Sequence, residues 1–224
     1  MGIPSFVTSS AVSRTSKAFA AGPLVMFALS RRMHFVSATP PSALPPLAEE
    51  THVCTTCDLA YGELAVADAV QEVRDIPAAA RAAIAAVPSD ARGLRPSTRV
   101  WSVTEYLCHL RDVFVVSTLR LRRARTEDEP AVDPMFGDLR AVRFRYADAD
   151  VDAVLDELHR AVEGFCDEVA DTRPDEWART VRRLPDEVRT AIWLVRQAAH
   201  EGRHHLRDIE RVGGEVASRP PFSG

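Results

Sequence analysis

Apolar residues recur at intervals of three and four along most of the chain after about residue 60, which is the spacing of one face of an α-helix. The clearest stretch follows Ser102-Val103-Thr104-Glu105, a capping box in which the serine and glutamate side chains satisfy free amide groups at a helix start. Its mainly apolar stripe consists of Val103, Tyr106, Leu107, Leu110, Val113, Phe114, Ser117 and Leu121. The pattern predicts a helix from Ser102 to about Arg125.

Other segments show the same periodicity. An alanine-rich run to Val87 predicts a helix that Pro77 opens at its first turn and Pro88 stops. A further helix fits residues 150–170, with an apolar stripe formed by Val151, Val154, Leu155, Leu158, Val162, Phe165 and Val169. The helical pattern before Pro88 and the pattern after residue 150 therefore flank the helix that begins at Ser102.

The last helix fits residues 190–212, and Gly213 and Gly214 are suited to its C-terminal cap. No stretch alternates between polar and apolar residues for long, so no extended strand is expected. Four amphipathic helices predict an all-α fold, a four-helix bundle. The long segment between the second and third helices, residues 126–149, is expected to be a crossover or a lid.

These patterns divide the chain into four parts. Residues 1–50 are expected to be a disordered or mis-called N-terminal extension, and residues 51–74 a Cys-x-x-Cys segment with a linker. The bundle is expected to occupy residues 75–214, followed by a flexible tail over residues 215–224.

The N-terminal extension differs in composition from the rest, because residues 1–48 contain no Asp or Glu. The apolar run over residues 18–29 resembles the core of an export or targeting signal, although Pro23 interrupts it. Alternatives are an ordered helix, or an over-called start with the true first residue at Met33. The sequence leaves these interpretations open.

Composition excludes several classes of protein. Hydrophobic residues make up 46% of the chain and charged residues 27%, as in a soluble globular protein, and no apolar run approaches the roughly 18 residues of a membrane span. The net charge of −4 gives no bulk attraction to nucleic acid. Four cysteines are too few for a disulfide scaffold, so we expect a cytoplasmic protein.

Lys17 is the single lysine among many arginines, which is typical of a GC-rich genome and suggests an actinobacterium.

Histidines cluster on the last predicted helix, at His200, His204 and His205, and His109 lies midway along the second helix. A metal site needs several donors held by rigid elements, and side chains four residues apart on a helix face the same way. Two pairs have this spacing, His200 with His204 and Glu201 with His205. The residues alone allow two interpretations. The histidines form a metal site, or the pair on the last helix lies on a solvated face and His109 is simply partly buried.

Helical phase favours the second pair. At about 100° per residue, the buried arc of the last helix is formed by Val188, Ile192, Val195, Ala198, Ala199, Gly202, Leu206 and Ile209. His205 lies at the edge of this arc and Glu201 just beyond it, whereas His200 and His204 point nearly away. Because a metal site in a bundle faces inward, we expect Glu201 and His205 to be ligands, with His200 and His204 as the alternative register.

His109 flanks the buried arc of its own helix in the same way. Glu105 lies four residues before it and Asp112 three residues after it, so either carboxylate is a candidate to orient the imidazole. His109 is therefore the candidate third ligand beside one pair on the last helix, and a partly buried histidine without a metal is the alternative.

The cysteines form one recognisable motif, Cys54-Thr55-Thr56-Cys57. A structural zinc site needs four ligands, and no second Cys-x-x-Cys is present. The motif is open to three interpretations: half of a zinc site completed by other ligands or a partner chain, a redox pair, or a remnant without a role. Cys108 and Cys166 lie on predicted helices and are expected to be core thiols.

Two segments together resemble the motifs of the DinB-like superfamily (DinB/YfiT-like proteins). Trp101-Ser102-Val103-Thr104-Glu105-Tyr106-Leu107-Cys108-His109 resembles the second-helix motif, a Trp and a polar cap followed by a metal-binding His. His200-Glu201-Gly202-Arg203-His204-His205-Leu206-Arg207-Asp208-Ile209 resembles the last-helix motif. The resemblance covers roughly residues 75–212 and implies a four-helix bundle.

The resemblance also implies a divalent metal, commonly zinc or nickel, held by one His of the second helix and two residues four apart on the last. The last pair is His and His in many members, and Glu and His in the branch of mycothiol-dependent maleylpyruvate isomerase. Anchored on His204-His205 and the following Ile209, the resemblance places the metal on His109, Glu201 and His205; anchored on the first histidine, it selects His200 and His204. The Arg-Gly-Gln that often follows the pair is replaced by Leu206-Arg207-Asp208.

The expected function follows from this resemblance. It implies a metal-dependent transferase or isomerase that uses a low-molecular-weight thiol such as mycothiol, with a metal-dependent hydrolase and a non-catalytic stress-response module as alternatives. Catalytic residues beyond the metal ligands are unknown, although Arg111, Arg143 and Arg145 are candidates for binding an anionic group. Partners are expected to be small molecules, with neither nucleic acid nor membrane, and with a homodimer paired through a helix face.

Overall fold

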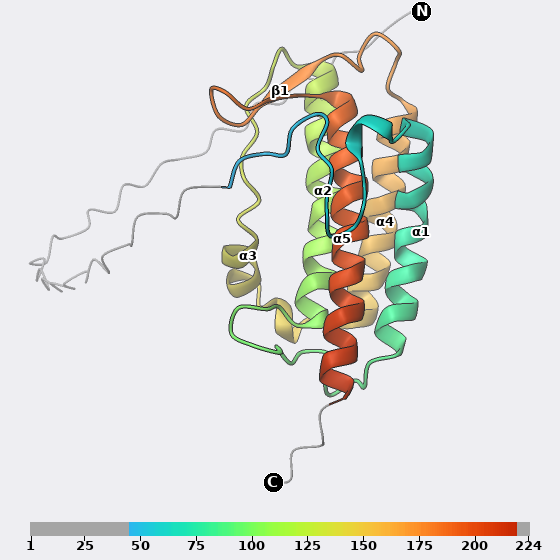
Figure 1. Cartoon of the computed structure of the whole chain (residues 1–224), viewed down its shortest axis with the longest axis vertical. Coiled ribbons are helices and arrows are strands. Elements are labelled where there is room, and N and C mark those ends of the chain that lie inside the picture. The colour runs from blue at the N-terminus through green and yellow to red at the C-terminus, as the bar shows by residue number, and fades with distance from the viewer. Residues whose placement is uncertain (1–44, 219–224) are drawn as a thin grey trace, which may run out of the picture. The chain divides into compact units, whose positions relative to one another are not determined.

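Four long helices form the bundle of this computed structural model, which describes residues 45–218 (Figure 1). They are α1 (Val66–Ala85), α2 (Val103–Thr126), α4 (Val151–Ala170) and α5 (Ala191–Ala217). α2 packs against α4 and α5, and α1 packs against the same two helices from the other side. The expected all-α bundle is confirmed, while most of the predicted N-terminal extension and the end of the predicted tail lie outside the described residues.

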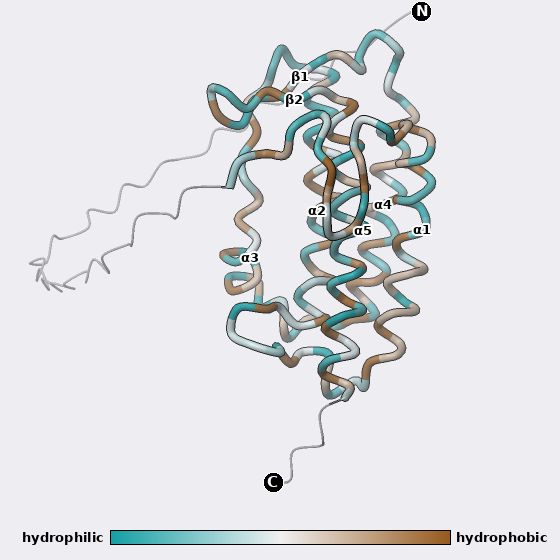
Figure 2. The backbone as a smooth tube through the Cα atoms, viewed as in Figure 1, coloured by the Kyte–Doolittle hydropathy of each residue, from teal (hydrophilic) through white to brown (hydrophobic). Residues whose placement is uncertain are grey.

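The bundle forms because each long helix combines buried apolar positions with polar ones, and both kinds recur along the tube in Figure 2. Helix starts agree with the sequence at three places: Ser102 closes the predicted capping box of α2, and Asp150 and Thr190 cap α4 and α5. None of the helices among the described residues is both long and apolar enough to cross a membrane.

The prediction for the first helix is wrong at its start. α1 begins at Val66 and contains Pro77 in its interior. A proline there removes one backbone hydrogen bond and costs about 3 kcal/mol, which burial of the apolar stripe offsets. This stripe consists of Ala69, Val73, Ile76, Pro77, Ala80 and Ile84. The helix ends at Ala85, close to the predicted stop at Pro88.

The predicted cap of the last helix is also wrong. α5 continues through Gly213 and Gly214 to Ala217. Gly213 is buried, and a Cβ at this position would lie 2.6 Å from Cγ2 of Val87. The residue is therefore suited to a close approach between α5 and the chain beyond α1, not to a helix end.

Shorter elements complete the described chain. The crossover over residues 126–149 contains α3 (Gly137–Arg143) and the 3-10 turn η2 (Tyr146–Asp148). A small antiparallel hairpin, which the sequence did not predict, pairs β1 (Thr180–Arg182) with β2 (Val188–Thr190), with Val181 opposite Arg189. Its strands are too short for an alternating pattern to stand out.

The segment before α1 has its own local structure, which ends in the 3-10 turn η1 (Tyr61–Glu63). It packs on β2 and on α5: the Glu50 carboxylate accepts hydrogen bonds from the backbone and side chain of Thr190, at 2.8 and 3.1 Å, and Arg196 of α5 donates to the carbonyl of Leu64 at 2.9 Å. Arg189 donates to the carbonyl of Ala48 at 2.7 Å. Residues 45–64 therefore cover a side of α5 that the bundle leaves open.

Candidate metal centre

Three side chains from two helices converge inside the bundle. His109 comes from α2, and Glu201 and His205 lie one turn apart on α5. One donor atom from each lies within 4.8 Å of the others. The rings of His109 and His205 meet edge to face with their centroids 4.8 Å apart. The structure thus brings together the inward register that helical phase favours.

A carboxylate fixes the orientation of His205. Its Nδ1 lies 3.2 Å from Oδ2 of Asp208, while its Nε2 lies 3.1 Å from Oε2 of Glu201. In metal sites, a carboxylate commonly binds one ring nitrogen and turns the other toward the ion. Asp208 holds that position here. The sequence signal for it was its place three residues after His205, on the same helix face.

Glu201 is held from its other side. Nε2 of Gln197 donates to Oε1 of Glu201 at 2.5 Å, and the hydroxyl of Tyr61 donates to Oε1 of Gln197. Tyr61 is fully buried and belongs to the segment before α1. A chain of hydrogen bonds therefore joins this segment to the candidate metal centre.

The electrostatics of the three side chains suit a cation. Burial and the neighbouring His205 lower the pKa of His109 to about 4, so its imidazole is neutral near pH 7. Burial opposes the charge on Glu201, but the hydrogen bond and charge of His205 lower the pKa of this carboxyl to about 2. Burial also opposes the charge on His205, whose pKa Asp208 and Glu201 raise to about 9.

These donors fit a divalent metal. Two imidazoles and a carboxylate are a ligand set found in catalytic zinc sites, and they also suit nickel. Nδ1 of His109 is buried and has no hydrogen-bond partner, which leaves this ring short of a polar contact. A bound cation would replace the proton that His205 shares with the two carboxylates, because metal ligands bind in the deprotonated form.

Comparison with models of known protein families shows to which family this chain belongs. The model of the DinB superfamily matches residues 39–209. The chain belongs to the DinB superfamily. The match starts well before residue 75, so it includes the Cys-x-x-Cys segment as well as the bundle.

A solved structure agrees with this fold. This DinB superfamily chain is similar to YfiT from Bacillus subtilis, described as a probable metal-dependent hydrolase with an unusual four-helix bundle topology. The TM-score is 0.59 at 20% sequence identity, over 66% of this chain and 85% of YfiT. At this identity the similarity establishes the fold. No curated protein matches the chain.

The two carboxylates that the sequence put forward as partners of His109 have other roles. Glu105 closes the capping box of α2 and pairs with Arg95, with Oε1 at 2.5 Å from Nη2. Asp112 accepts hydrogen bonds from Arg111 at 2.9 Å and from Nε of Arg140 at 2.7 Å. Neither carboxylate bonds to His109 in the structure.

The ring of His109 packs against Trp101 instead, with centroids 5.0 Å apart. Nε1 of Trp101 donates to Oδ1 of Asp138 at 3.0 Å, which ties the indole to α3 of the crossover. A Cβ at Gly137 would lie 2.8 Å from Trp101 and 3.4 Å from Cε1 of His109. The crossover therefore lies directly against a metal-ligand candidate.

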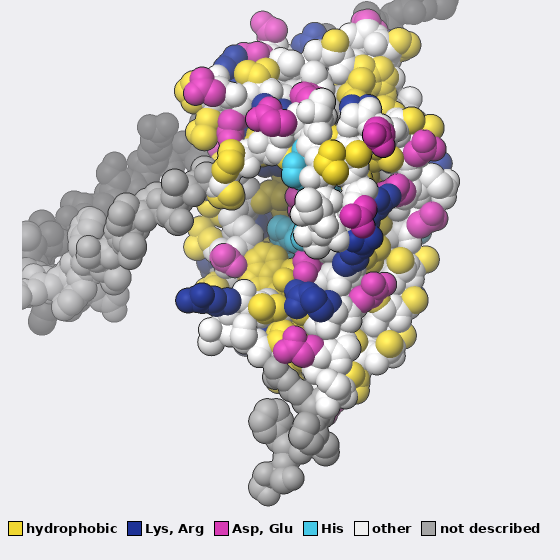
Figure 3. Space-filling view, viewed as in Figure 1, with side chains coloured by type: hydrophobic (Ala, Val, Ile, Leu, Met, Phe, Trp, Pro, Cys, Tyr) yellow, Lys and Arg dark blue, Asp and Glu magenta, His cyan; other side chains and the backbone are white. Residues whose placement is uncertain are grey.

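The site remains open to solvent. The side chain of Glu201 is 28% exposed, whereas that of His205 is 15% exposed. In the space-filling view, the surface is hollowed beside the crossover, and histidine side chains are visible inside the hollow (Figure 3). The Glu201 carboxylate and the His205 imidazole are therefore in partial contact with solvent.

Of the three arginines suggested for anion binding, Arg111 is held in ion pairs, whereas Arg143 and Arg145 are exposed. Arg111 is engaged by Asp112 and by Glu157, whose Oε2 lies 2.6 Å from Nη1. Arg143 and Arg145 are exposed on or after α3, and Arg145 pairs with Asp148. None of the three makes a contact that assigns it to the metal centre.

The alternative register lies elsewhere. His200 and His204 lie on a neighbouring face of α5, about 100° around the helix from Glu201 and His205, and there their ring nitrogens lie close to the sulfurs of Cys54 and Cys57. Helical phase predicted that these two side chains point away from the bundle interior. In the structure, the segment before α1 covers the face of α5 on which they lie. The sequence missed this cover because contacts between distant segments leave no periodic signal.

Proposed function

We propose that this protein is a metal-dependent transferase or isomerase that acts with a low-molecular-weight thiol such as mycothiol. His109, Glu201 and His205 would hold one zinc or nickel ion. The observation that carries the proposal is the convergence of three donors from two rigid helices at a solvent-accessible point.

The donor number supports a catalytic role. Among residues 45–218, no fourth histidine, cysteine or carboxylate belongs to this group. Structural zinc sites have four protein ligands, whereas catalytic sites have three and an open position. At such a position a divalent metal lowers the pKa of a bound thiol or water and so supplies a nucleophile at neutral pH.

The surrounding carboxylates favour a thiol over water as the nucleophile. Asp208 is engaged by His205 and Arg211, Asp112 by two arginines, and Glu105 by Arg95. These ion pairs leave the three carboxylates poorly suited to accept a proton from water. A thiol that coordinates a metal is deprotonated without a separate base.

A metal-dependent hydrolase is the second candidate, because the description of YfiT names that activity. The two candidates use the same three ligands and differ in the nucleophile. A substrate that accepts both water and a thiol at the same carbon would therefore separate them.

Metal content tests the site. Protein purified without a histidine tag would be analysed for bound metal, for the wild type and for His109→Ala, Glu201→Ala and His205→Ala. Each substitution is expected to remove about one ion per chain. His159→Ala is the matched control, since this exposed histidine of α4 lies outside the group. Unchanged metal content in all three variants would contradict the proposal.

Turnover tests the chemistry. The metal-loaded protein would be incubated with an electrophilic substrate, with and without a small thiol, and the products separated. Thiol-dependent product that disappears with His109→Ala supports the transferase. Hydrolysis product without thiol supports the hydrolase, and bound metal with neither product supports the non-catalytic module.

A further inference from the structure

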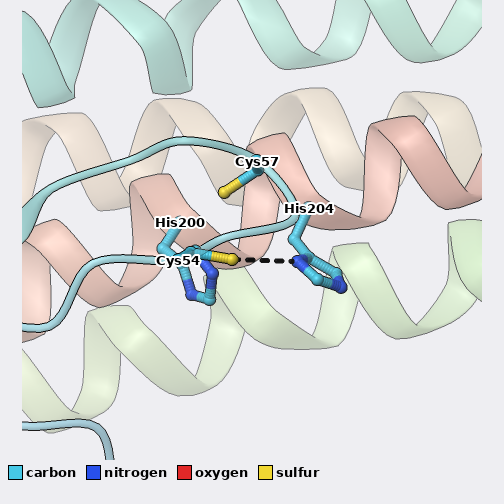
Figure 4. A group of neighbouring side chains, drawn as sticks. All are labelled: Cys54, Cys57, His200 and His204. Atoms are coloured by element: carbon cyan, nitrogen blue, oxygen red, sulfur yellow. Dashed lines mark hydrogen bonds between the residues drawn. The ribbon is translucent and has the colours of Figure 1, made fainter.

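A second cluster of metal-binding side chains lies on a neighbouring face of α5, where the ring centroid of His204 is 5.7 Å from that of His205. Cys54, Cys57, His200 and His204 each place a donor atom within 4.8 Å of the others. Sγ of Cys54 lies 3.8 Å from Nδ1 of His204. In Figure 4 the two cysteines come from one turn of the covering segment, and the two imidazoles rise from the helix beneath it.

The cysteines are held in a tight turn. The amide of Asp58 donates to the carbonyl of Cys54 at 2.8 Å, and the amide of Cys54 donates to the carbonyl of Leu59 at 3.0 Å. Asp58 has a φ of 58°, a left-handed conformation that reverses the chain after Cys57. Both cysteines are free thiols, 7% and 0% exposed. The turn therefore directs two buried sulfurs at α5.

The histidines complete the cluster from the helix. His200 and His204 lie one turn apart, so their rings point to the same side. Both ring nitrogens of His200 are buried without a hydrogen-bond partner. A buried polar atom without a partner is destabilising, so a metal ion bound at this ring would remove part of that cost.

Two arginines of α5 hold the turn over the histidines. Arg203 donates to the carbonyl of Cys57 at 3.4 Å, and Arg207 donates to the carbonyl of Thr56. Arg203 also pairs with Glu72 of α1. The position of the sulfurs relative to the imidazoles thus has support besides the cluster itself.

We propose that Cys54, Cys57, His200 and His204 bind a zinc ion in a closed Cys2His2 site, separate from the metal centre of the bundle. Two thiolates and two imidazoles form a common structural zinc site, with metal–sulfur distances of about 2.3 Å and metal–nitrogen distances of about 2.0 Å. Tetrahedral geometry at these lengths separates sulfur from nitrogen by roughly 3.6 Å, close to the 3.8 Å observed.

The site would fasten the segment before α1 to the helix that carries Glu201 and His205. A redox pair explains the chemistry less well, because a disulfide between the cysteines would leave the nitrogens of His200 buried and unpaired. Zinc would bind both sulfurs and one ring nitrogen of each histidine. The fourth protein ligand closes the coordination shell, so this ion stabilises structure and leaves no position for a substrate.

The zinc site also supports the metal centre next to it. Tyr61 lies in the segment that the zinc would fasten, with its ring centroid 5.5 Å from that of His200. Its hydroxyl reaches Gln197, which holds Glu201. Fixing the segment therefore fixes the hydrogen bond that orients a ligand of the neighbouring site.

Cobalt substitution tests the proposal on the full chain. Cobalt bound by thiolates gives a charge-transfer absorption that cobalt bound by imidazole and carboxylate lacks. The band is expected in the wild type and in His109→Ala, it should weaken by at least half in Cys57→Ser, and it should disappear when Cys54→Ser and Cys57→Ser are combined. Cys166→Ala is the matched control, a buried cysteine of α4 outside the cluster. Absence of the band in metal-loaded wild type would overturn the proposal, and so would its full intensity in a folded protein that carries both Cys54→Ser and Cys57→Ser.

Thiol protection tests the same site without a substitution. Reduced, zinc-loaded wild type would be treated with a thiol reagent, with and without a chelator, and the modified cysteines identified by peptide mapping. Cys54 and Cys57 are expected to react at least tenfold more slowly before chelation. Equal rates with and without chelator, or a Cys54–Cys57 disulfide in place of bound zinc, would contradict the site.

Discussion

At the scale of single residues, Asp208 is the side chain with the most consequence for the metal centre. It holds Nδ1 of His205 at 3.2 Å and pairs with Arg211 at 2.9 Å. A carboxylate in this position sets the tautomer and the direction of a ligand imidazole. Its role is thus to position His205, not to bind the ion.

Asp208→Asn is expected to weaken metal binding at this centre by about 10- to 100-fold, because the amide orients the imidazole less strongly. Competition with a chelator of known affinity measures the change. Glu210→Gln is the control, an exposed carboxylate on the same helix. Equal losses in both variants would show that charge near α5, and not orientation of His205, sets the affinity.

Glu105 gives a pH-dependent contribution to stability. Burial raises the pKa of this carboxyl, but Arg95 and the amide of Ser102 outweigh burial and lower it. A lowered pKa in the folded state stabilises the protein above the unfolded pKa of about 4.3, and this stabilisation is lost as the pH falls through the folded value.

Glu105→Gln is therefore expected to reduce the free energy of unfolding by about 1–3 kcal/mol at pH 7, with a smaller difference at pH 3. Urea unfolding at both pH values measures this. Asp128→Asn, at an exposed position, should change stability little. A deficit of Glu105→Gln that is the same at both pH values would exclude ionisation as its cause.

At the scale of elements, α1 and α5 approach closely at Gly202. A Cβ there would lie 2.1 Å from Cδ1 of Ile76 and 3.4 Å from Cζ of Phe114. The glycine follows Glu201 directly and lies, along α5, between the two members of each pair of ligand candidates. Its missing side chain lets the helices pack at the level of both metal sites.

Gly202→Ala is expected to destabilise the bundle by about 1–3 kcal/mol through overpacking. Gly164→Ala is the matched control, since a Cβ at this exposed position of α4 meets nothing within 4 Å. The control should stabilise by about 0.5–1 kcal/mol through helix propensity. Thermal unfolding of both variants compares them, and a stabilised Gly202→Ala would contradict the close approach.

Ser102, Gly213 and Pro77 show how far sequence patterns predict the ends of helices. The capping box at Ser102 located the start of α2, because a cap is a local signal. Gly213 instead suggested a helix end, because a glycine required for packing and a glycine required for a cap look alike in sequence. Pro77 likewise suggested a helix start, although it lies inside α1. The neighbouring sequence does not show that this proline is buried against the core.

At the scale of the whole molecule, the two candidate sites differ in how well sequence could predict them. Spacing and helical phase selected His109, Glu201 and His205, which the structure brings together. The zinc cluster could not be assembled from sequence, because Cys54 and His204 are 150 positions apart. Each half was visible, as a Cys-x-x-Cys and a His pair, but nothing local joined them.

Metal removal is expected to lower the thermal stability of the full chain. An ion that binds only the folded state stabilises it by about 2.7 kcal/mol at a free concentration 100 times its dissociation constant. For a protein of this size, that raises the melting temperature by roughly 5–10 °C per site.

Scanning calorimetry with zinc and with a chelator measures this shift. A double variant, His109→Ala with His200→Ala, is expected to melt at the same temperature in both conditions. A chelator effect that persists in the double variant would place the stabilising ion elsewhere.

The two sites use consecutive positions of α5, His200 with His204 on one face and Glu201 with His205 on the neighbouring face. A point substitution removes a ligand from one set and leaves the other in place. Insertion of a single residue near the start of α5 instead rotates everything after it by about 100°, which displaces both sets together. This turn of the helix therefore tolerates replacement one site at a time but does not tolerate a change of length, so insertions and deletions are expected to be excluded from it more strictly than substitutions.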